Sequence, residues 1–190
     1  MIEVLGDMGI KVEDVANADV IERGLNGDLQ SRQLQAQKLV QMARDAAIED
    51  GKSFAYETVM SHPSHVHAAR RAVSQGFHVR LIFVTTDDPE INVARVRARV
   101  AKGGHDVPAD KVRERWHRAM HESLIAMVQT AGESMIFDNS DSGIRPAPRP
   151  IAHIMGKFVW FWAQPDLRWP RPCLFDKLAA TGLYVPKQRG

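Results

Sequence analysis

The sequence predicts an α/β fold in which a parallel sheet is flanked by helices on both sides. Short apolar or β-branched runs alternate along the chain with longer segments of helical periodicity, and glycines stand where several of those helices should stop. The composition agrees with a single domain, because 190 residues of which 44% are hydrophobic bury one sizeable core. In such folds, ligands bind beyond the carboxyl ends of the strands.

A long helix is expected over residues 29–50, between a strand at residues 12–16 and another short strand at 53–57. Gly51 follows the helix at the place where a C′ glycine ends one. The positions of this helix predicted to face the core are Leu39, Ala43, Ala46 and Ala47.

A second helix over residues 65–75 ends before Gly76, and the clearest strand of the chain follows at residues 79–85. Asp88 is expected to cap the next helix with Pro89 at its first position, because proline loses no hydrogen bond there. The positions predicted to face inward are Val66, Ala69 and Val73 in the first of these helices, and Val93, Val96 and Val100 in the second.

A helix over residues 109–130 and a strand over 135–139 complete the alternation of strands and helices. We therefore expect a main domain at residues 1–144. The positions predicted to form the apolar face of the last helix are Val112, Trp116, Met120, Leu124 and Met127.

The remaining residues, 145–190, are expected to pack on this domain as a terminal strand and an irregular, proline-containing extension. Residues 145–150 alternate arginine or alanine with proline, which predicts a stiff linker. Beyond Gln164 the chain shows little periodicity and carries four prolines, so that no regular element is predicted there.

Charge and cysteine content exclude several classes of protein. A net charge of +2 is too small for bulk nucleic-acid binding, so a nucleic-acid partner is disfavoured. The one cysteine allows neither an intrachain disulfide nor a cysteine-based metal site, which favours a cytoplasmic location. The first twenty residues carry five acidic side chains, unlike a signal peptide, and the apolar run from Phe158 is too short to span a bilayer.

Residues 95–118, here called the basic lid, carry eight Lys or Arg side chains around the pair Gly103-Gly104. Planar guanidinium groups around a developing phosphate charge are what phosphoryl transfer requires, and a double glycine can act as a hinge. His105 lies inside this hinge, where it either caps the lid helix or contacts a phosphate. The arginines expected to share a helix face are Arg95 with Arg99, and Arg115 with Arg118.

Two carboxylates fall where an α/β enzyme places its active site. Asp19 follows the first expected strand, and Glu57 ends the second. A carboxylate can accept a hydroxyl proton or hold a Mg²⁺-bound water. The alternatives are that Asp19 is a helix N-cap and that Glu57 is paired in the interior.

Two other patterns are weaker. His62, His65 and His67 cluster without a fixed helical pair, which is a poor metal-ligand pattern. Residues 50–53, Asp-Gly-Lys-Ser, end like a phosphate-binding loop, but position 46 is alanine where that motif has glycine. They also run from helix into strand, the reverse of the required order, which predicts a solvated turn.

Seven motifs occur in this order: Asn17–Leu25, Ser53–Thr58, Gly76–Val84, Arg95–Arg99, Gly103–Pro108, Arg113–Arg118 and Asp138–Ser140. Their combination over residues 15–140 resembles the zeta-toxin-like P-loop kinases. The resemblance implies a three-layer P-loop NTPase or kinase-like sandwich, ATP with Mg²⁺, and phosphorylation of a hydroxyl on a small acceptor. In zeta toxins, which belong to bacterial toxin-antitoxin pairs, that acceptor is UDP-N-acetylglucosamine, so a UDP-sugar and an antitoxin protein are the implied partners.

By this resemblance, Asp19 matches the aspartate that activates the acceptor hydroxyl, and Glu57 matches the strand-end carboxylate near substrate and metal. Arg115 matches the arginine that reaches the ATP phosphates, with Arg99 or Arg118 as second candidate. The implied binding residues are Thr58, Arg95, Arg99, His105, Arg118, Asp138 and Asn139. The alternative for the stretch from Asp138 is a turn in which its carboxylate caps backbone amides.

One departure from the family pattern concerns the phosphate loop and its lysine, which should precede Asn17 by about twenty to thirty residues. Residues 1–16 contain only Gly6, Gly9 and Lys11, in no such context. We therefore expect either a start further upstream or an N-terminally shortened fold with weakened ATP turnover. The rival hypothesis is a non-catalytic module that uses the basic lid to hold a nucleotide, a UDP-sugar or a partner protein.

Overall fold

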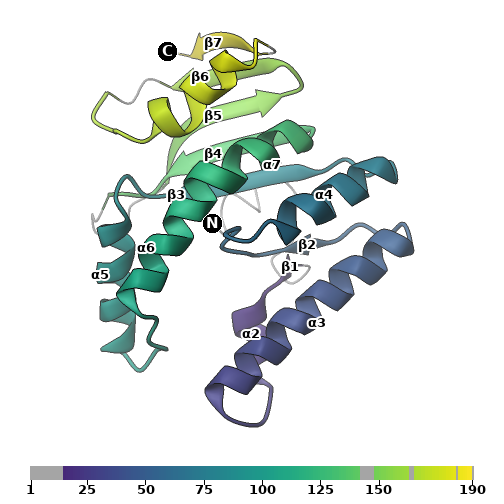
Figure 1. Cartoon of the computed structure of the whole chain (residues 1–190), viewed down its shortest axis with the longest axis vertical. Helices are drawn as coiled ribbons and strands as arrows, with labels where there is room; N and C mark the ends of the chain where they lie inside the picture. The colour runs from purple at the N-terminus through teal and green to yellow at the C-terminus, as the bar shows by residue number, and fades with distance from the viewer. Residues whose placement is uncertain (1–14, 142–147, 163–164, 183, 190) are drawn as a thin grey trace. The chain divides into compact units, whose positions relative to one another are not determined.

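The computed structural model describes residues 15–141, 148–162, 165–182 and 184–189 (Figure 1). The α/β class predicted from the sequence is confirmed. Backbone contacts divide the chain into two compact units. Unit 1 comprises Met1–Val59 with Ser74–Phe77, and unit 2 comprises Met60–Val73 with His78–Gly190.

The described residues of unit 1 form two short parallel strands and two helices. The strands are β1 (Val15–Ala16) and β2 (Ala55–Tyr56), and the helices are α2 (Ala18–Arg23) and α3 (Leu29–Glu49). The helices contact each other through an ion pair, in which Oε1 of the buried Glu22 of α2 lies 2.8 Å from Nε of the half-buried Arg32 of α3. The strand and helix positions expected for this part of the sequence are therefore confirmed within the described residues, and residues 12–14 of the first expected strand lie outside them.

The buried stripe of α3 differs from the expected one. Its core residues are spaced four apart, at Ala36, Val40, Arg44 and Ile48. The prediction that Leu39 faces the core was wrong, since its side chain is 40% exposed. The stripe that turns inward includes Arg44, whose guanidinium pairs with Asp45 at 2.9 Å and lies over the Tyr56 ring.

Unit 2 is built on a five-stranded mixed sheet in the order β3-β4-β5-β6-β7. The strands are β3 (Arg80–Thr85), β4 (Glu133–Asp138), β5 (Arg149–Met155), β6 (Phe158–Trp162) and β7 (Val185–Arg189). The predicted parallel pairing holds for β3 with β4, whereas β5 is antiparallel to both of its neighbours. Residues 149 and 150 thus begin a strand, and residues 145–147 of the expected linker lie outside the described residues.

The helices that accompany this sheet follow the predicted sequence positions. They are α4 (Ser64–Ser74), α5 (Pro89–Val100), α6 (Ala109–Arg118) and α7 (Leu124–Thr130). The helix expected over residues 109–130 is continuous but contains one π-helical turn, η2 (Ala119–Ser123), between α6 and α7. In α4, the prediction for Val73 was wrong, because this side chain is 43% exposed and Ala72 is buried in its place.

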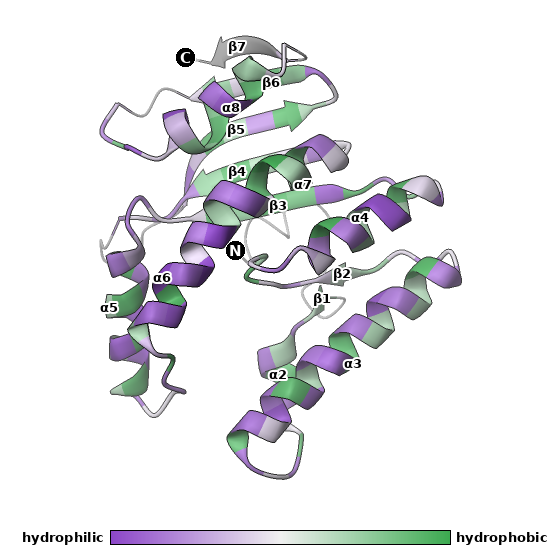
Figure 2. Ribbon diagram, in the orientation of Figure 1, coloured by the Kyte–Doolittle hydropathy of each residue, from purple (hydrophilic) through white to green (hydrophobic). Residues whose placement is uncertain are grey.

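The core of unit 2 lies where η2 and α7 pack on the sheet, and Figure 2 shows hydrophobic residues along α7, β4 and β5. Its fully buried side chains are Met120, Leu124, Ile136, Ile151 and Leu174. No helix in the described part of the chain is both long and apolar enough to cross a membrane.

The residues beyond 164 do not form an irregular extension, and that expectation was wrong. They form η3 (Arg171–Phe175), α8 (Asp176–Ala180) and β7, and they bury Trp169 and Cys173 in the core of unit 2. Proline at the start of η3 replaces an amide that would have no helical partner, so it favours helix initiation. Burial raises the pKa of the Cys173 thiol, as expected for a structural cysteine.

Candidate active site

The candidate catalytic residues of unit 1 lie at the carboxyl ends of the parallel strands β1 and β2. Asn17 follows β1 and caps α2, with its side-chain oxygen accepting from the backbone amides of Asp19 at 2.8 Å and Val20 at 3.3 Å. The side-chain nitrogen of Asn17 donates to Glu57 Oε2 at 2.7 Å. The backbone amide of Glu57 donates to the Ala16 carbonyl at 3.0 Å, which continues the strand pairing. The fold therefore brings Asp19 and Glu57 to one edge through Asn17.

Both alternatives considered for these carboxylates are excluded by the structure. The N-cap of α2 is Asn17, so the Asp19 carboxylate is not needed as a cap. Asp19 lies in the first turn of the helix, where the helix dipole favours a negative charge. Glu57 is exposed and is not paired in the interior. Among the residues that the structure describes, neither carboxylate forms an ion pair with a Lys or Arg side chain.

Asn17 itself was not among the residues selected from the sequence as functional. Its role as a cap was foreseeable, because asparagine is a preferred N-cap residue before a helical pattern. Its contact with Glu57 spans 40 positions, so no local signal indicates it. Thr58, the neighbour of Glu57 expected to bind substrate, is exposed at the same edge of unit 1.

The basic lid of unit 2 consists of α5 and α6, which lie side by side and are joined by an elbow (Figure 1). Asp88 caps α5 and Pro89 begins it, as predicted. Gly103 has a φ of +84°, and a Cβ atom on Gly104 would lie 2.6 Å from Arg99 Cγ. Both glycines are thus required by the local backbone at the end of α5, and their use as a hinge stays a prediction.

Most guanidinium groups of the basic lid already have partners within unit 2. Arg95 donates to the Asn139 carbonyl at 2.7 Å, and Arg99 donates to the His105 carbonyl at 3.3 Å. Arg118 pairs with Glu114 at 3.1 Å. Three of the four arginines expected to form the cationic faces therefore bind other groups of the protein itself.

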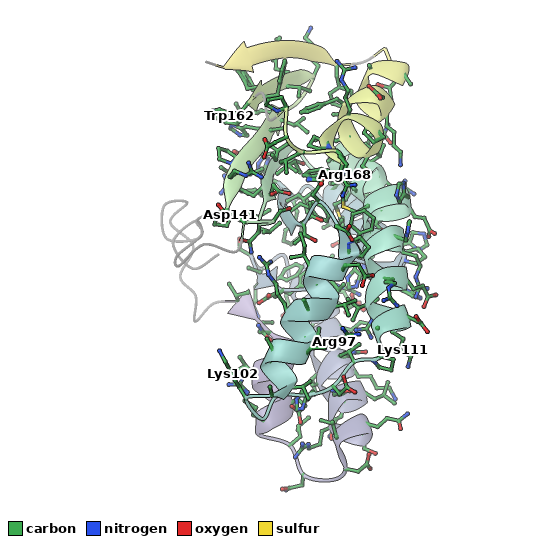
Figure 3. The ribbon with its side chains drawn as sticks, turned by 90° about the vertical axis from the view of Figure 1, so that its left-hand side faces the viewer. Arg97, Lys102, Lys111, Asp141, Trp162 and Arg168 are labelled. Atoms are coloured by element: carbon green, nitrogen blue, oxygen red, sulfur yellow. The ribbon has the colours of Figure 1, made fainter. Side chains whose placement is uncertain are left out.

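A further pair joins the two lid helices. Arg113 of α6 binds Glu90 of α5, and this hydrogen bond lowers the pKa of the Glu90 carboxyl. Trp116 donates its indole N–H to the Thr86 carbonyl at 3.1 Å, which fixes α6 to the end of β3. Arg115 is partly buried, and its guanidinium forms no hydrogen bond or ion pair with the residues that the structure describes. Figure 3 shows Arg97, Lys102 and Lys111 spread along the exposed surface of the lid.

Asp138 ends β4 and serves as a structural residue. Its carboxylate is only 1% exposed and accepts from the backbone amide and hydroxyl of Ser140, both at 2.9 Å, and from the Trp169 indole at 2.8 Å. Arg149 lies 3.4 Å away. The alternative of a turn capped by Asp138 is therefore what the structure shows. The backbone of Asn139 forms two hydrogen bonds. Its amide donates to the Thr85 carbonyl, and its carbonyl accepts from the Arg95 guanidinium.

A cavity of about 530 Å³ lies beyond the carboxyl ends of β3 and β4, as expected for an α/β sheet. Asp87 accepts from the backbone amides of Arg168 and Trp169, and Arg149 binds Asp166 at 2.7 Å. The chain beyond residue 164, to which no role was assigned from the sequence, thus forms one wall. The lining residues are Asp87, Asp88, Glu90, Ile91, Ser140, Asp141, Arg149, Asp166, Leu167 and Arg168.

The two weaker patterns are placed as follows. His62 Nδ1 contacts Ser64 Oγ at 2.9 Å before α4, and the described residues contain no group of three or more His, Cys, Asp or Glu arranged to hold a metal ion. Lys52 is exposed and pairs with Asp50 at 2.8 Å between α3 and β2. The interpretation of residues 50–53 as a solvated turn is therefore confirmed.

Comparison with known proteins decides the family. The family model described as zeta toxin matches residues 28–144, which is more than half of the chain. The chain belongs to the zeta toxin family. Glu57, Arg115 and Asp138 lie inside the matched segment, whereas Asn17 and Asp19 precede it. The resemblance drawn from the motifs is thus confirmed, and the fold is consistent with a P-loop kinase-like protein.

Among curated proteins, an uncharacterized protein of Haemophilus influenzae is 36% identical over 70 residues, which make up 37% of this chain and 50% of that protein. The chain therefore spans about half the length of this curated relative. No solved structure matches the sequence.

Proposed function

We propose that this zeta toxin family protein is an ATP-dependent phosphotransferase that phosphorylates a hydroxyl group of a small acceptor such as UDP-N-acetylglucosamine. The observation that carries the proposal is the edge of unit 1, where Asn17 holds both the α2 terminus bearing Asp19 and the strand-end carboxylate Glu57. A carboxylate held on a fixed backbone and open to a ligand can accept the proton of an acceptor hydroxyl.

The roles follow from charge and exposure. The Asp19 carboxylate accepts the proton of the acceptor hydroxyl, since it is exposed and free of a cationic partner among the described residues. Glu57 orients the acceptor or a water of the metal, because one of its oxygens is held by Asn17 and the other is left for a ligand. Arg115 supplies a planar guanidinium to the transferred phosphate.

Two exposed carboxylates fit Mg²⁺, whereas residues 1–16 carry no phosphate-loop motif for the ATP phosphates. Carboxylate oxygens at exposed positions suit a hard cation that keeps most of its waters, and Asp19 and Glu57 provide them. When bound, Mg²⁺ neutralises charge on the phosphates during transfer.

An assay of phosphoryl transfer tests the proposal. The full-length protein is incubated with ATP, Mg²⁺ and a series of UDP-sugars, and Asp19→Asn is compared with the wild type. We expect the variant to lower kcat by roughly 10²- to 10⁴-fold with ATP affinity unchanged, because the amide keeps the shape and loses the proton acceptor.

The matched control is Glu49→Gln, which makes the same chemical change at an exposed position at the end of α3 and should leave turnover unchanged. Wild-type turnover in Asp19→Asn would reject the role of Asp19. A complete absence of transfer by the wild type to every acceptor would reject the kinase function.

A second candidate function is a non-catalytic module that binds a nucleotide or a partner protein, with an antitoxin as the partner that the family suggests. The observation that favours it is that Arg95, Arg99, Arg113 and Arg118 are engaged within the protein and so are not available to a transferred phosphate. The exposed cations of the basic lid, Arg97, Lys102 and Lys111, are left to contact a ligand or partner. Calorimetry distinguishes the two, because such a module binds ATP·Mg²⁺ or a UDP-sugar without releasing ADP.

A further inference from the structure

We infer that Asn17 is a positioning residue of the phosphotransferase site, one that orients Glu57 and the start of α2 with a single side-chain amide. The inference rests on the proposed function for its catalytic consequence. The contact itself can be tested independently of activity.

The first step concerns the side-chain amide of Asn17, whose oxygen and nitrogen bind different partners. The oxygen of Asn17 accepts from the amides of Asp19 at 2.8 Å and Val20 at 3.3 Å, while the nitrogen donates to Glu57 Oε2 at 2.7 Å. Only one orientation of the amide satisfies these contacts, because the flipped group would face two N–H donors with a donor and a carboxylate with an acceptor. Asn17 is thus fully used as both acceptor and donor at this edge.

The second step is that the backbone around Glu57 is already fixed. Val15 pairs with Ala55 and Ala16 with Tyr56, and the Glu57 amide donates to the Ala16 carbonyl at 3.0 Å. The freedom that remains lies in the Glu57 side chain, which is exposed and would otherwise sample several rotamers. The hydrogen bond from Asn17 selects one of them, and a charged acceptor makes this bond stronger than a neutral one.

The third step compares the residue types that could replace Asn17. Serine caps a helix about as well as asparagine, but its one hydroxyl is shorter than the amide and would have to serve the cap and Glu57 with the same atom. Aspartate also caps well, but it would place a second carboxylate beside Glu57 and repel it. Alanine loses both contacts. Substitutions at position 17 therefore separate capping from the orientation of Glu57.

The experiment compares Asn17→Ser and Asn17→Ala in the full-length protein by thermal unfolding and by steady-state kinetics. Asn17→Ser should leave the melting temperature nearly unchanged and lower kcat by roughly ten- to a hundredfold, with the KM for ATP unaltered, because the nearby carboxylate loses its orientation. Asn17→Ala should show the same kinetic loss together with a lower melting temperature.

The matched control is Asp28→Ser at the N-cap of α3, where the native carboxylate accepts from the Ser31 amide at 3.0 Å. It exchanges one capping side chain for another without touching Asn17, so turnover should stay at the wild-type level. Wild-type kinetics in Asn17→Ser would overturn the inference, because Asn17 would then be only a cap.

A nuclear magnetic resonance measurement keeps the inference testable if the protein transfers no phosphate. The side-chain amide protons of Asn17 should shift clearly in Glu57→Gln, since a charged acceptor is replaced by a neutral one, and should stay in place in Glu49→Gln. Unchanged Asn17 signals in Glu57→Gln would show that the contact is absent in solution. Shifted signals in an inactive wild type would instead leave the contact standing and reject the kinase function.

Discussion

At the scale of single residues, the arginines of the basic lid differ in what they are free to do. Arg95 and Arg99 are bound to backbone carbonyls, and Arg118 is bound to Glu114. A guanidinium already engaged in this way must break a contact before it reaches a ligand. Arg115 forms no such contact within the described residues, so it is the lid arginine we expect to bind phosphate.

Arg115→Lys should therefore lower kcat by roughly a hundredfold while changing ATP affinity by less than about threefold, because lysine keeps the charge and loses the planar fork. Arg97→Lys makes the same substitution at an exposed position of the same lid and should have almost no effect. Steady-state kinetics and calorimetry measure both quantities. Equal losses in the two variants would mean that the lid acts only as a diffuse positive patch.

At the scale of elements, three adjacent strands are joined by one carboxylate. Glu133 of β4 accepts from Arg80 Nε of β3 at 2.6 Å and contacts His153 Nε2 of β5 at 2.9 Å. Burial acts to raise the pKa of Glu133, but the hydrogen bonds from His153 and Arg80 outweigh it, so the pKa lies below its reference value of 4.5. The charged form of Glu133 is thus favoured by folding.

A pKa lowered by folding stabilises the protein above the unfolded value of 4.5, and this contribution is lost as the pH falls through the folded pKa. Glu133→Gln should lower the melting temperature at pH 7 by roughly 2–6 °C. The difference from the wild type should shrink as the pH falls below 4.5. Thermal unfolding at a series of pH values measures it. A difference that is constant with pH would show that Glu133 acts by packing rather than by charge.

At the scale of the whole molecule, the two units have cores of different size. The large apolar cluster, including Met120, Leu124 and Ile136, belongs to unit 2. The described core of unit 1 rests on the stripe of α3 and on two strands of two residues each. Small sheets and small apolar cores give little independent stability.

Backbone amides in α3 should therefore exchange with deuterium at least about tenfold faster than those in β4, because unit 1 opens at a lower free energy than unit 2. Hydrogen-exchange mass spectrometry of the native protein measures both segments in one experiment. Equal protection of the two segments would indicate that the chain opens only as one cooperative unit.

The sequence by itself determined the α/β class, the family and the positions of most elements. Asp88 and Pro89 start α5, Gly51 ends α3, and the β-branched run becomes β3, because caps and periodicity are encoded by neighbours within a few positions. The edge carrying Asp19 and Glu57 followed from the same signals, since parallel strands present their carboxyl ends together.

Only the tertiary structure decided which partners these residues have. The contact of Asn17 with Glu57 spans 40 positions, and that of Trp169 with Asp138 spans 31. The tertiary structure also decided which stripe of α3 is buried and where the proline-containing end of the chain packs on the core. Local spacing fixes how a side chain is directed from its own element, whereas the group it meets depends on how distant elements pack, which a single sequence does not encode in any short pattern.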